Sequence, residues 1–595
     1  MRRGRAPTPP PVCSHEIHAD GTRAWDSLNM TAHRRIGMII AGLVSIALVA
    51  GCGTASDSGH PTTSTAPGVI PLISTDDLRG AQSDEVHLFG LNDFHGNLQP
   101  PASSNGKIAG YDAGGAAYLA THLARLKQAY PASAVLSAGD NIGASPLVSG
   151  LFHDEPTITF LNSIGLAASS VGNHEFDSGV VELARLQQGG CALAGCSPGA
   201  PFTGAKFPFL AANVTGADGK LPPTLRPWTM LEVGGHKIGV IGTVTPETAS
   251  IVLPEGIRGY TFGDEVAAIN RYVPEVKSAG AQTVVALVHD GGVQKTAQNA
   301  AVDYNGCANI SPEVTALATG VDPAVRVLFT GHSHQPYVCT IDGKVVTQAA
   351  SYGRLITDVT LRFGADGVQA SAVNRVVTRE VTPDAATTSL IDFYAEQAKP
   401  RAERPVGIAA ASLPHEPAGS GESPLGDVIA DSMLSVTAPA PASAVAAFMN
   451  PGGVRTDLKS GQISYGDIYS VQPFGNQVVT VTMTGSQILR LLEQQWSNGK
   501  TTVLSPAGLT YTYVESSPKG GKVVADSVRI GGQPLNPVAT YRITTNSFLA
   551  SGGDGFTVFT ESTDKTVGPI DLDAFETYLK GRPPLESPPA RAGKR

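Results

Sequence analysis

Apolar, β-branched runs recur between residues 86 and 334, and polar residues close each run. The runs are VHLFGLND (86–93), AVLSAGDN (134–141), KIGVIGTVT (237–245), TVVALVHDGG (283–292) and VRVLFTGHSH (325–334). Such runs predict buried strands. Helix-like stretches lie between them, for example AAYLATHLARLKQAY (116–130). Because strands alternate with helices, we expect a layered α/β domain.

A second folded unit is expected after a predicted helix at 383–402. It contains the segments PLGDVIADSML, AVAAFMNPGGVRTDL and YRITTNSFLASGGDGF, with many glycine turns but no comparable cluster of histidines. We place the boundary between residues 375 and 405. The residues after about 580 are rich in Pro and Arg, so we predict a disordered tail at 581–595.

The segment 30–52 has the pattern of an export signal. Arg34 and Arg35 precede an apolar run that is too short to span a bilayer comfortably, and the segment closes with VAGC. This closing motif resembles the bacterial lipobox, in which the cysteine, here Cys52, becomes the lipidated first residue of the mature protein. We therefore expect residues 1–52 to be an upstream extension with a lipoprotein signal peptide. A plain cleaved signal peptide is the alternative.

Residues 53–82 are rich in Ser, Thr, Gly and Pro and predict a flexible tether. The expected location is the outer face of a cell membrane, facing the exterior or the periplasm, with attachment through the lipid on Cys52. The 595 residues exceed one ordinary domain. The formal net charge of -9 argues against a protein that binds nucleic-acid polymers through a basic surface.

Four cysteines lie beyond the signal segment, and an even number in an exported chain suggests disulfides. Cys191 with Cys196 would close a short loop, and Cys307 with Cys339 would form the second bridge. A zinc site at Cys191 and Cys196 is the alternative, but the chain has no second pair of that kind to complete it.

Five segments of the first unit, each after an apolar run, contribute side chains of the metal-ligand type: NDFHGN, AGDN, GNHE, LVHDGG and GHSH. These side chains are Asp93, His95, Asp140, Asn173, His174, His289, His332 and His334. Residues i and i+2 of an extended segment point to the same side, so Asp93 with His95, and His332 with His334, can each offer two ligands to one place. Each motif is weak by itself and is usually a polar strand end; their order and number favour a metal site.

The donor set indicates two divalent ions. Asp, Asn and His without thiolates suit Zn, Mn or Co and differ from a structural zinc site. A carboxylate such as Asp140 can bridge two ions, which together can hold a phosphate oxygen and activate water. The sequence therefore predicts a dinuclear centre that hydrolyses phosphate esters.

The motifs D-x-H, GDN, GNHEFD, H-D-G and GHSH, in this order, resemble the metallophosphoesterase (calcineurin-like) signature. The longer spellings NDFHGNL and GNHEFD resemble the 5′-nucleotidase family, which includes bacterial UDP-sugar hydrolase/5′-nucleotidases. The resemblance extends to the second unit through NPGGVRTDL, QPFGN and NSFLASGGDGF. It implies a four-layer α/β/β/α catalytic domain at 83–375, a linker helix at 376–405 and a smaller α/β nucleotide-binding domain at 406–580.

The resemblance implies a role for each matching residue of the catalytic domain. The ligands of the first ion would be Asp93, His95 and His334, those of the second ion would be Asn173, His289 and His332, and Asp140 would bridge the two. His174 and Asp177 would form a catalytic pair. In this pair, His174 would donate to the phosphoryl oxygen or the leaving group, and Asp177 would orient and charge it.

The resemblance also implies a nucleotide site in the second unit. Asn450 and Arg455 would bind the phosphate or base side, Phe474 and Phe548 would sandwich the base, and Asp554 would take the ribose hydroxyls. Stacking accepts any base, so a broad nucleotide preference is expected. Core packing is the alternative for the two phenylalanines, and a plain turn is the alternative for Asp554.

Three positions near these motifs need a separate interpretation. The family commonly has an arginine before the segment ESPLGD, where this chain has Gly421; Arg455 or Arg404 would have to compensate. In GNHEFD, we expect Gly172 to allow a sharp turn. Glu175 has no expected chemical role, and we predict a structural hydrogen bond for it.

The function implied is an exported, metal-dependent phosphohydrolase that dephosphorylates nucleotides, with UDP-sugars as further candidate substrates. One alternative is a 2′,3′-cyclic-nucleotide 2′-phosphodiesterase/3′-nucleotidase. Another is a non-catalytic nucleotide-binding lipoprotein, although such a protein has no need of the catalytic pair. A sulfur-ester hydrolase on the same fold is a third, but the NPGGVR and phenylalanine segments favour a nucleotide.

Overall fold

The computed structural model describes residues 84–101, 106–294, 302–497 and 501–595. All of them belong to one compact unit of the chain, 66–595. The predicted signal peptide, Cys52 and the tether lie outside the described residues. Among the helices that the structure describes, none has both the length and the apolar character required to cross a membrane.

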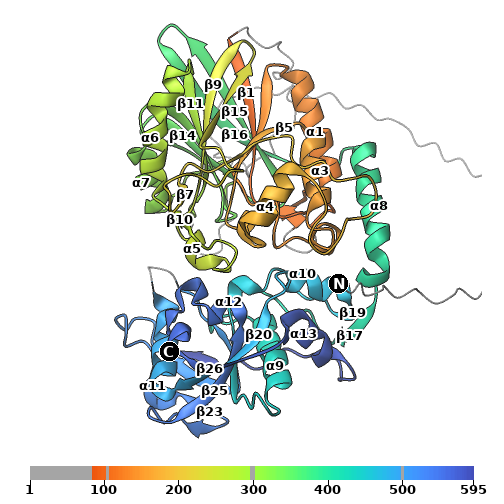
Figure 1. The fold of residues 1–595 in the computed structure, drawn as a ribbon, viewed down its shortest axis with the longest axis vertical. Coiled ribbons are helices and arrows are strands. Elements are labelled where there is room, and N and C mark those ends of the chain that lie inside the picture. The colour runs from red at the N-terminus through yellow and green to blue at the C-terminus, as the bar shows by residue number, and fades with distance from the viewer. Residues whose placement is uncertain (1–83, 102–105, 295–301, 498–500) are drawn as a thin grey trace, which may run out of the picture. The chain divides into compact units, whose positions relative to one another are not determined.

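Two six-stranded mixed sheets form the N-terminal region (Figure 1). The first has the order β16-β15-β1-β4-β5-β6, with bounds Gly367–Val376, Leu355–Gly364, Glu85–Leu91, Ser133–Ser137, Leu166–Ser170 and Phe209–Leu210. The second has the order β13-β14-β12-β11-β9-β8, with bounds Pro336–Ile341, Lys344–Ala349, Val325–Thr330, Thr283–His289, His236–Val244 and Trp228–Val233. Neighbours β1, β4 and β5 run parallel, as do β9, β11 and β12.

The alternation of side chains along each strand explains why the two sheets stack. On β1, Val86 and Leu88 enter the apolar cluster that both sheets share, whereas Phe89 and Leu91 enter the cluster beneath the helices. The second sheet divides its side chains in the same way. Gly90 allows the close approach of the sheets, since a Cβ there would lie 2.3 Å from the ring of Phe329.

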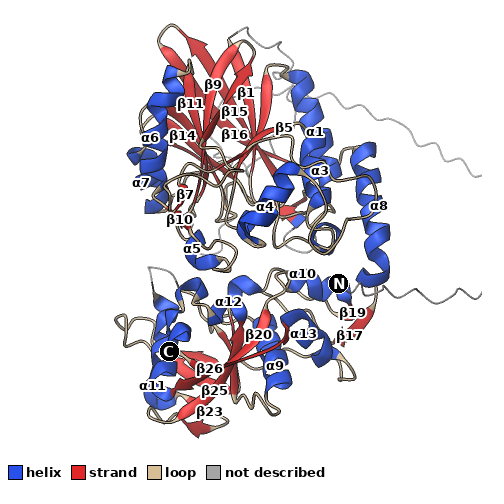
Figure 2. Ribbon diagram, in the orientation of Figure 1, coloured by secondary structure: helices blue, strands red, loops and turns tan. Residues whose placement is uncertain are grey.

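Helices cover the outer face of each sheet (Figure 2). The helices over the first sheet are α1 (Ala116–Ala129), α3 (Glu155–Ser163) and α4 (Gly179–Gln188). Those over the second sheet are α6 (Glu265–Ser278) and α7 (Pro312–Gly320). The four-layer α/β/β/α arrangement is therefore confirmed, together with the strands and the helix that the hydrophobic pattern predicted.

Short elements connect these layers at the end that carries the polar loops. They are β2 (Lys107–Ile108), β3 (Tyr111–Asp112), α2 (Leu147–Gly150), the 3-10 turn η2 (His174–Phe176), β7 (Val214–Gly216), α5 (Thr248–Ile251) and β10 (Tyr260–Phe262). Helix α2 also reaches the C-terminal region, because Leu147 packs in an apolar cluster of that region.

Helix α8 (Ala385–Ala402) leads from β16 to the C-terminal region. The helix begins after Asp384, whose side chain accepts a hydrogen bond from the backbone N–H of Thr387. A smaller α/β region follows. Its five-stranded sheet has the order β21-β18-β25-β20-β26, with bounds Ser505–Ala507, Ala446–Met449, Thr540–Asn546, Gln477–Thr484 and Thr563–Ile570.

Both faces of this sheet are covered. Ala447 and Met449 on β18 enter one apolar cluster, and Ala446 and Phe448 enter another. The helices of the region are α9 (Pro424–Thr437), α10 (Tyr465–Val471), α11 (Gly485–Glu493), α12 (Ser547–Ala550) and α13 (Asp571–Leu579). The remaining strands are β17 (Pro405–Ala409), β19 (Gly461–Ser464), β22 (Leu509–Tyr513), β23 (Arg529–Ile530), β24 (Gln533–Pro534) and β27 (Ala592–Lys594).

Both predicted disulfides are present. Cys191 is bonded to Cys196, and Cys307 is bonded to Cys339 of β13. The alternative of a zinc site at Cys191 and Cys196 is therefore wrong.

The prediction of a disordered tail at 581–595 is also wrong. Strand β27 pairs in parallel with β22, and Arg591 binds Asp431 with an Nη2–Oδ2 distance of 2.6 Å. The backbone N–H of Ala592 donates to Glu422 at 3.0 Å. The composition suggested disorder because the tail has few apolar residues. In the structure, Arg591 binds an acidic side chain, and the backbone of the tail pairs with a strand of the C-terminal region.

Substitution Arg591→Ala is expected to lower the free energy of unfolding by about 1–3 kcal/mol, because Asp431 and the carbonyl of Pro506 lose a charged donor. Urea denaturation followed by circular dichroism measures this change. Arg595→Ala, at an exposed position four residues further on, is the matched control with little effect expected. Equal stability of the two variants would contradict a docked tail.

Candidate active site

The candidate ligands gather where the carboxyl ends of the parallel strands of both sheets meet, which is where layered α/β folds build sites. The ligand residues after the first sheet's strands are Asp93 and His95 (β1), Asp140 (β4), and Asn173 and His174 (β5). Those of the second sheet are His289, which ends β11, and His332 and His334, which follow β12.

The backbone at these loops is left-handed and not extended. Asp93, His95, Asp140, His332 and His334 have φ angles of 48°, 46°, 50°, 69° and 57°. The expectation of extended i and i+2 pairs is therefore wrong, although each pair does direct its side chains to one place. Non-glycine residues in this region cost of order 1 kcal/mol each and persist where the surroundings fix them.

Hydrogen bonds between the loops supply that support. The backbone N–H of Asp93 donates to Gly139, and that of His95 donates to Asp140, at 2.9 and 3.0 Å. The N–H of Tyr352 donates to the carbonyl of Asp93 at 2.8 Å. Backbone hydrogen bonds therefore connect the loops after β1, β4 and β14.

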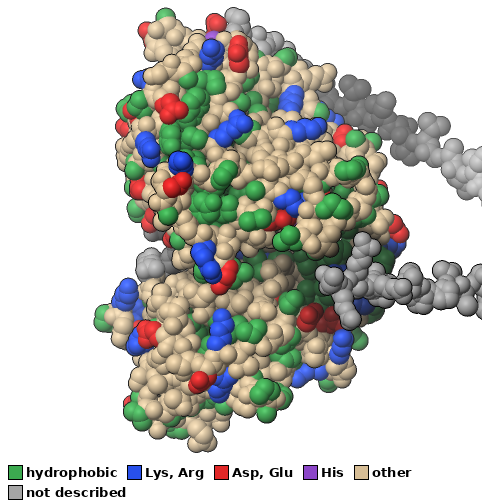
Figure 3. Space-filling model, viewed as in Figure 1, with side chains coloured by type: hydrophobic (Ala, Val, Ile, Leu, Met, Phe, Trp, Pro, Cys, Tyr) green, Lys and Arg blue, Asp and Glu red, His purple; other side chains and the backbone are tan. Residues whose placement is uncertain are grey.

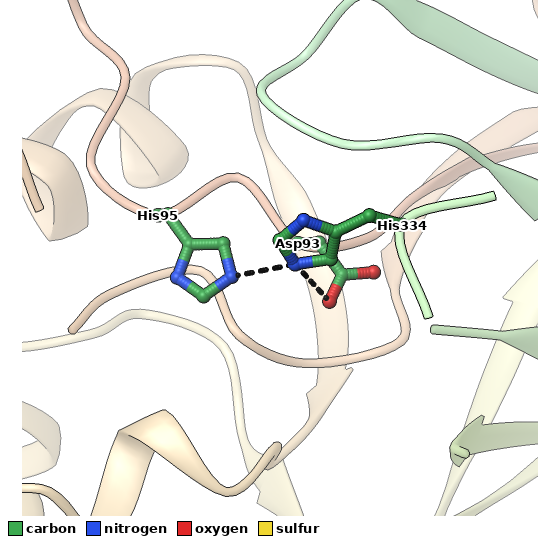
Figure 4. A group of neighbouring side chains, drawn as sticks. All are labelled: Asp93, His95 and His334. Atoms are coloured by element: carbon green, nitrogen blue, oxygen red, sulfur yellow. Dashed lines mark hydrogen bonds and ion pairs between the residues drawn. The ribbon is translucent and has the colours of Figure 1, made fainter. Parts of the chain in front are cut away.

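Asp93, His95 and His334 form the first cluster (Figure 4). The Nε2 atoms of His95 and His334 lie 3.1 Å apart, and Nε2 of His334 lies 3.4 Å from Oδ1 of Asp93. The other ring nitrogen of His95 lies 2.8 Å from the carbonyl of Gly143, to which it can donate. This contact favours the tautomer in which Nε2 presents a lone pair to the cluster.

Asp140, His289 and His332 form the second cluster, and Asn173 lies among them. Nε2 of His289 lies 3.1 Å from Oδ2 of Asp140 and 3.2 Å from Oδ1 of Asn173. Nδ1 of His332 lies 3.0 Å from the same asparagine oxygen. Oδ2 of Asp140 also lies 3.6 Å from Nε2 of His95, so this carboxylate stands between the two clusters.

The donor atoms fit two divalent ions. Nε2 of His289 faces oxygens while its Nδ1 lies 2.7 Å from the carbonyl of Ala138, as in His95. Lone pairs therefore converge from both clusters, and two buried carboxylates, Asp93 and Asp140, supply negative charge. Nitrogen and oxygen donors without sulfur suit ions such as Zn, Mn or Co.

Charge interactions dominate the acid–base behaviour of this site. Burial raises the pKa of Asp140, but the charges of His289 and His174 outweigh burial and hold it well below its usual range. Burial lowers the pKa of His289, yet Asp140 raises it to about 10. A metal ion bound at His289 would compete with a proton for the same nitrogen.

His174 and Asp177 form the expected pair, with 2.8 Å between Nδ1 and Oδ2. Burial lowers the pKa of His174, but Asp177 and Asp140 raise it above its ordinary value overall. The backbone N–H of His174 donates to Oδ1 of Asp140 at 2.9 Å, which connects the pair to the carboxylate between the two clusters. The His174 ring stacks on Phe474 with 5.6 Å between ring centroids.

Glu175 has the structural role that the sequence suggested. Its buried carboxylate accepts from the backbone N–H groups of Asp140, Asn141 and Gly172, at 2.9, 2.9 and 2.5 Å. Burial and the charge of Asp140 raise its pKa to about 7. One side chain thus fixes the loops after β4 and β5.

Gly172 and Asn92 have roles that the sequence analysis did not predict. Gly172 is required by close packing, because a Cβ there would lie 2.1 Å from Oδ1 of Asp140. Asn92, which the sequence analysis passed over, donates to Oδ2 of Asp93 at 2.6 Å and accepts from the N–H of Ala349. No motif marks Asn92 except its place beside a ligand.

A cleft of about 720 Å³ adjoins the two clusters. From the N-terminal region it is lined by Asn173, His174, Asp177 and His332. The five predicted nucleotide-binding residues line the same cleft from the C-terminal region, namely Asn450, Arg455, Phe474, Phe548 and Asp554. The structure therefore brings the predicted catalytic pair and the predicted base-binding groups to one space.

The cleft residues also contact one another. Nδ2 of Asn450 donates to Oδ2 of Asp554 at 2.8 Å, and the guanidinium of Arg455 lies 5.7 Å from the ring centroid of Phe474. Asn476, Gln494 and Thr557 also line the cleft. Asn476 ends the QPFGN segment, but the sequence analysis gave none of the three a role.

The two arginines considered as replacements for the family's arginine have different surroundings. Arg455 lines the cleft, whereas Arg404 binds both carboxylate oxygens of Glu576 at 2.7 and 2.8 Å. Gly421 itself lies beside Val503, whose Cγ2 would be 2.8 Å from an added Cβ. The expectation that Arg404 compensates for the family's missing arginine is therefore not supported. Arg455 remains the candidate for that role.

Comparisons with known proteins agree with this site. Residues 401–561 match the family model described as 5′-nucleotidase, C-terminal domain. Endonuclease YhcR of Bacillus subtilis is 32% identical over 509 residues, which are 83% of this chain and 39% of that protein. Cell wall protein Lmo0130 of Listeria monocytogenes is 31% identical over 552 residues, which are 86% of this chain and 69% of that protein.

A solved structure extends the likeness over both regions. The 5′-nucleotidase precursor from Thermus thermophilus superposes with a TM-score of 0.72 at 27% identity, covering 86% of this chain and 99% of that one. The four-layer fold and the His/Asp clusters define a hydrolase of the metallophosphoesterase type. The chain belongs to the 5′-nucleotidase family.

Substitution Glu175→Gln is expected to weaken metal binding roughly tenfold or more, because an amide NH₂ would face backbone N–H donors and release the loop of Asp140. Metal content per chain after dialysis, measured by atomic emission, checks this result. Glu232→Gln, at an exposed position on β8, is the control. Unchanged metal content in Glu175→Gln would contradict the role given to this carboxylate.

Proposed function

We propose that this protein is an exported phosphohydrolase that dephosphorylates nucleotides with two divalent ions. One observation carries the proposal: a single cleft is lined by His174 and Asp177 on one side and by Phe474 and Phe548 on the other. A nucleotide has the matching halves, since its phosphate is the reacting group and its base is a flat ring that aromatic side chains can hold.

The two ions would be held by the sets given above, with Asp140 between them. When bound, such ions lower the pKa of a water molecule and neutralise charge on the phosphoryl oxygens. Zn, Mn and Co all suit these ligands. The fit of the donor atoms supports two sites and leaves the choice of metal to measurement.

His174 would act on the leaving group. Its pKa is raised through Asp177 and Asp140, which favours the protonated imidazole that can donate to an oxygen as the P–O bond breaks. Asp177 would hold the ring by the bond to Nδ1. Because the backbone of His174 is tied to Asp140, the donor would keep its place relative to the reacting phosphorus.

The nucleoside would occupy the part of the cleft in the C-terminal region. Phe474 and Phe548 would sandwich the base and accept purines and pyrimidines alike. The hydrogen-bonded pair of Asn450 and Asp554 offers polar atoms for the ribose hydroxyls. Arg455 lines the cleft and is the positively charged residue expected there. It would therefore bind the phosphate.

The main alternative is a 2′,3′-cyclic-nucleotide 2′-phosphodiesterase/3′-nucleotidase, and a non-catalytic nucleotide-binding lipoprotein is a second. A polymer substrate has less support here, although a relative is named an endonuclease. On the face drawn in Figure 3, the described Lys and Arg side chains are scattered among acidic ones, and the net charge is -9.

Export is part of the proposal. The two disulfides fit an oxidising compartment, and one relative is named a cell wall protein. The signal peptide and a lipid anchor on Cys52 would deliver and retain the protein outside the cell. We also propose the division into a catalytic domain at 83–375, a linker around α8 and a nucleotide-binding domain at 406–580.

Chelation followed by metal add-back should switch phosphate release off and on. AMP, UDP-glucose, 2′,3′-cAMP and 3′-AMP are the substrates to compare with purified protein. We expect AMP to release phosphate only with added metal, because water activation requires the ions. A preference for 2′,3′-cAMP and 3′-AMP would establish the alternative enzyme, and AMP binding without any turnover would establish a binding protein.

Substitution His174→Ala should lower kcat for AMP by about a hundredfold or more, the contribution typical of a general acid. Steady-state kinetics at saturating metal measures it. His153→Ala, which removes an exposed histidine, is the matched control and should retain full turnover. Full turnover in His174→Ala would overturn the assigned role.

A further inference from the structure

A cavity of about 290 Å³ lies at the end of the second sheet that is opposite the candidate metal centre. It is lined by Thr283, the first residue of β11, and by Ala324 and Arg326 beside the start of β12. The metal centre lies at the other end of β11, where His289 closes the strand. Because a strand rises about 3.3 Å per residue, the two ends of β11 are about 20 Å apart. The cavity is therefore separate from the active site.

The walls of this cavity carry more positive than negative charge. Lys277, in the last turn of α6, and Arg326 contribute two cations. Asp366, in the turn between β15 and β16, is the acidic residue of the lining. The side-chain oxygen of Gln282 accepts from the backbone N–H of Lys237 at 2.9 Å, which leaves the amide NH₂ of Gln282 as a further donor. This balance of charge favours an anion.

Arg326 is the extra residue of a β-bulge in β12. Val284 of β11 pairs with Val325 of β12. The next residue of β11, Val285, pairs with Val327, so Arg326 has no partner on β11. A bulge changes the direction of a side chain relative to a regular strand, and bulges are frequent beside functional sites. The bulge therefore accounts for a cation on the cavity wall in a strand that is otherwise apolar except for one threonine.

Two polar atoms of the wall lack a hydrogen-bond partner among the residues that the structure describes. They are Nε of Arg326 and Oγ1 of Thr283, and both atoms are buried. Thr283 as a whole is 4% exposed. A buried polar group without a partner costs about 1–3 kcal/mol, and native proteins rarely contain one without a reason. Two such groups on one cavity wall point to a ligand with acceptor atoms.

The size of the cavity suits a small molecule. Its volume of about 290 Å³ is close to the lower limit of roughly 300 Å³ that is typical of ligand pockets. It far exceeds the space that one water molecule occupies, about 30 Å³ in the liquid. Small or apolar residues form the rest of the lining, namely Ala281, Val284, Ala324, Gly367 and Val368. An anionic group with a short organic substituent would fit these walls.

We propose that this cavity binds a phosphate group, either as the free ion or attached to a small organic molecule. The planar guanidinium of Arg326 can donate two parallel hydrogen bonds to phosphate oxygens. The ammonium of Lys277 adds a point charge, and the hydroxyl of Thr283 can donate to another oxygen. The site is non-catalytic and does not depend on the proposed function, because its ligand binds away from the metal centre.

Isothermal titration calorimetry with inorganic phosphate tests the site in the purified protein after chelation of its metals. Substitutions Arg326→Gln and Thr283→Val should each weaken phosphate binding roughly tenfold, because each removes a hydrogen bond to a charged group. Arg271→Gln, which removes an exposed arginine on α6 outside the cavity wall, is the matched control and should bind as the wild type does. Arg326→Gln should keep the wild-type Tm, since the buried Nε has no hydrogen bond to lose within the described chain.

Two results would overturn the site. One is the lack of saturable phosphate binding in the wild-type protein, or equal affinity in the wild type and Arg326→Gln. The other is loss of binding in Arg455→Gln together with full binding in Arg326→Gln, which would assign the anion to the nucleotide cleft. Failure of nucleotide hydrolysis after metal add-back would refute the proposed function and leave this measurement unaffected.

Acetate and glycerol 3-phosphate identify the chemistry of the ligand in the same titration. A phosphate monoester carries about -1.5 to -2 charges and three acceptor oxygens, so acetate should bind roughly tenfold more weakly than phosphate. Equal binding of acetate would overturn the assignment to phosphate. Tighter binding of glycerol 3-phosphate than of inorganic phosphate would identify an organic phosphate as the ligand, and the reverse order would identify the free ion.

Discussion

One buried carboxylate holds the active-site loops of this protein in place. Glu175 accepts three backbone hydrogen bonds from two loops that follow neighbouring parallel strands. Those loops carry Asp140, which stands between the metal clusters, and His174, whose N–H is bound by Asp140. A buried carboxylate without these donors would be costly, so its burial and the loop geometry stabilise each other. Glu175 therefore helps to fix the loops that carry Asp140 and His174.

The same principle explains why the strained backbone of the site persists. Asp93 and His95 lie in the left-handed region, where a non-glycine residue is disfavoured. Their N–H groups bind the loop after β4, and Asn92 holds the Asp93 carboxylate. Asp93 and His95 are thus each fixed by at least one bond to another loop. Rigid support of this kind lets ligand atoms converge before a metal arrives, which lowers the cost of ordering them on binding.

The strands and the clustering of the candidate ligands could be predicted because short stretches of sequence mark both. Alternation on β1 sends Val86 and Phe89 to opposite faces, and a polar residue after a buried strand marks the edge where sites form. It could not predict the left-handed loops, because the i and i+2 spacing is the same in either geometry. It also missed the ordered tail and the partner of Arg404, since Asp431 lies 160 residues from Arg591 and Glu576 lies 172 residues from Arg404. Only the fold brings such residues together.

The contrast between core strands and surface loops also indicates which residues determine substrate choice. The candidate metal ligands follow core strands, so their positions depend on the packing of both sheets. Part of the wall of a neighbouring cavity comes instead from the exposed residues Ala109 and Glu416 and from the loop at His415. Surface loops accept change at small cost in stability. Such loops can therefore change without disturbing the residues that are predicted to hold the reacting phosphate.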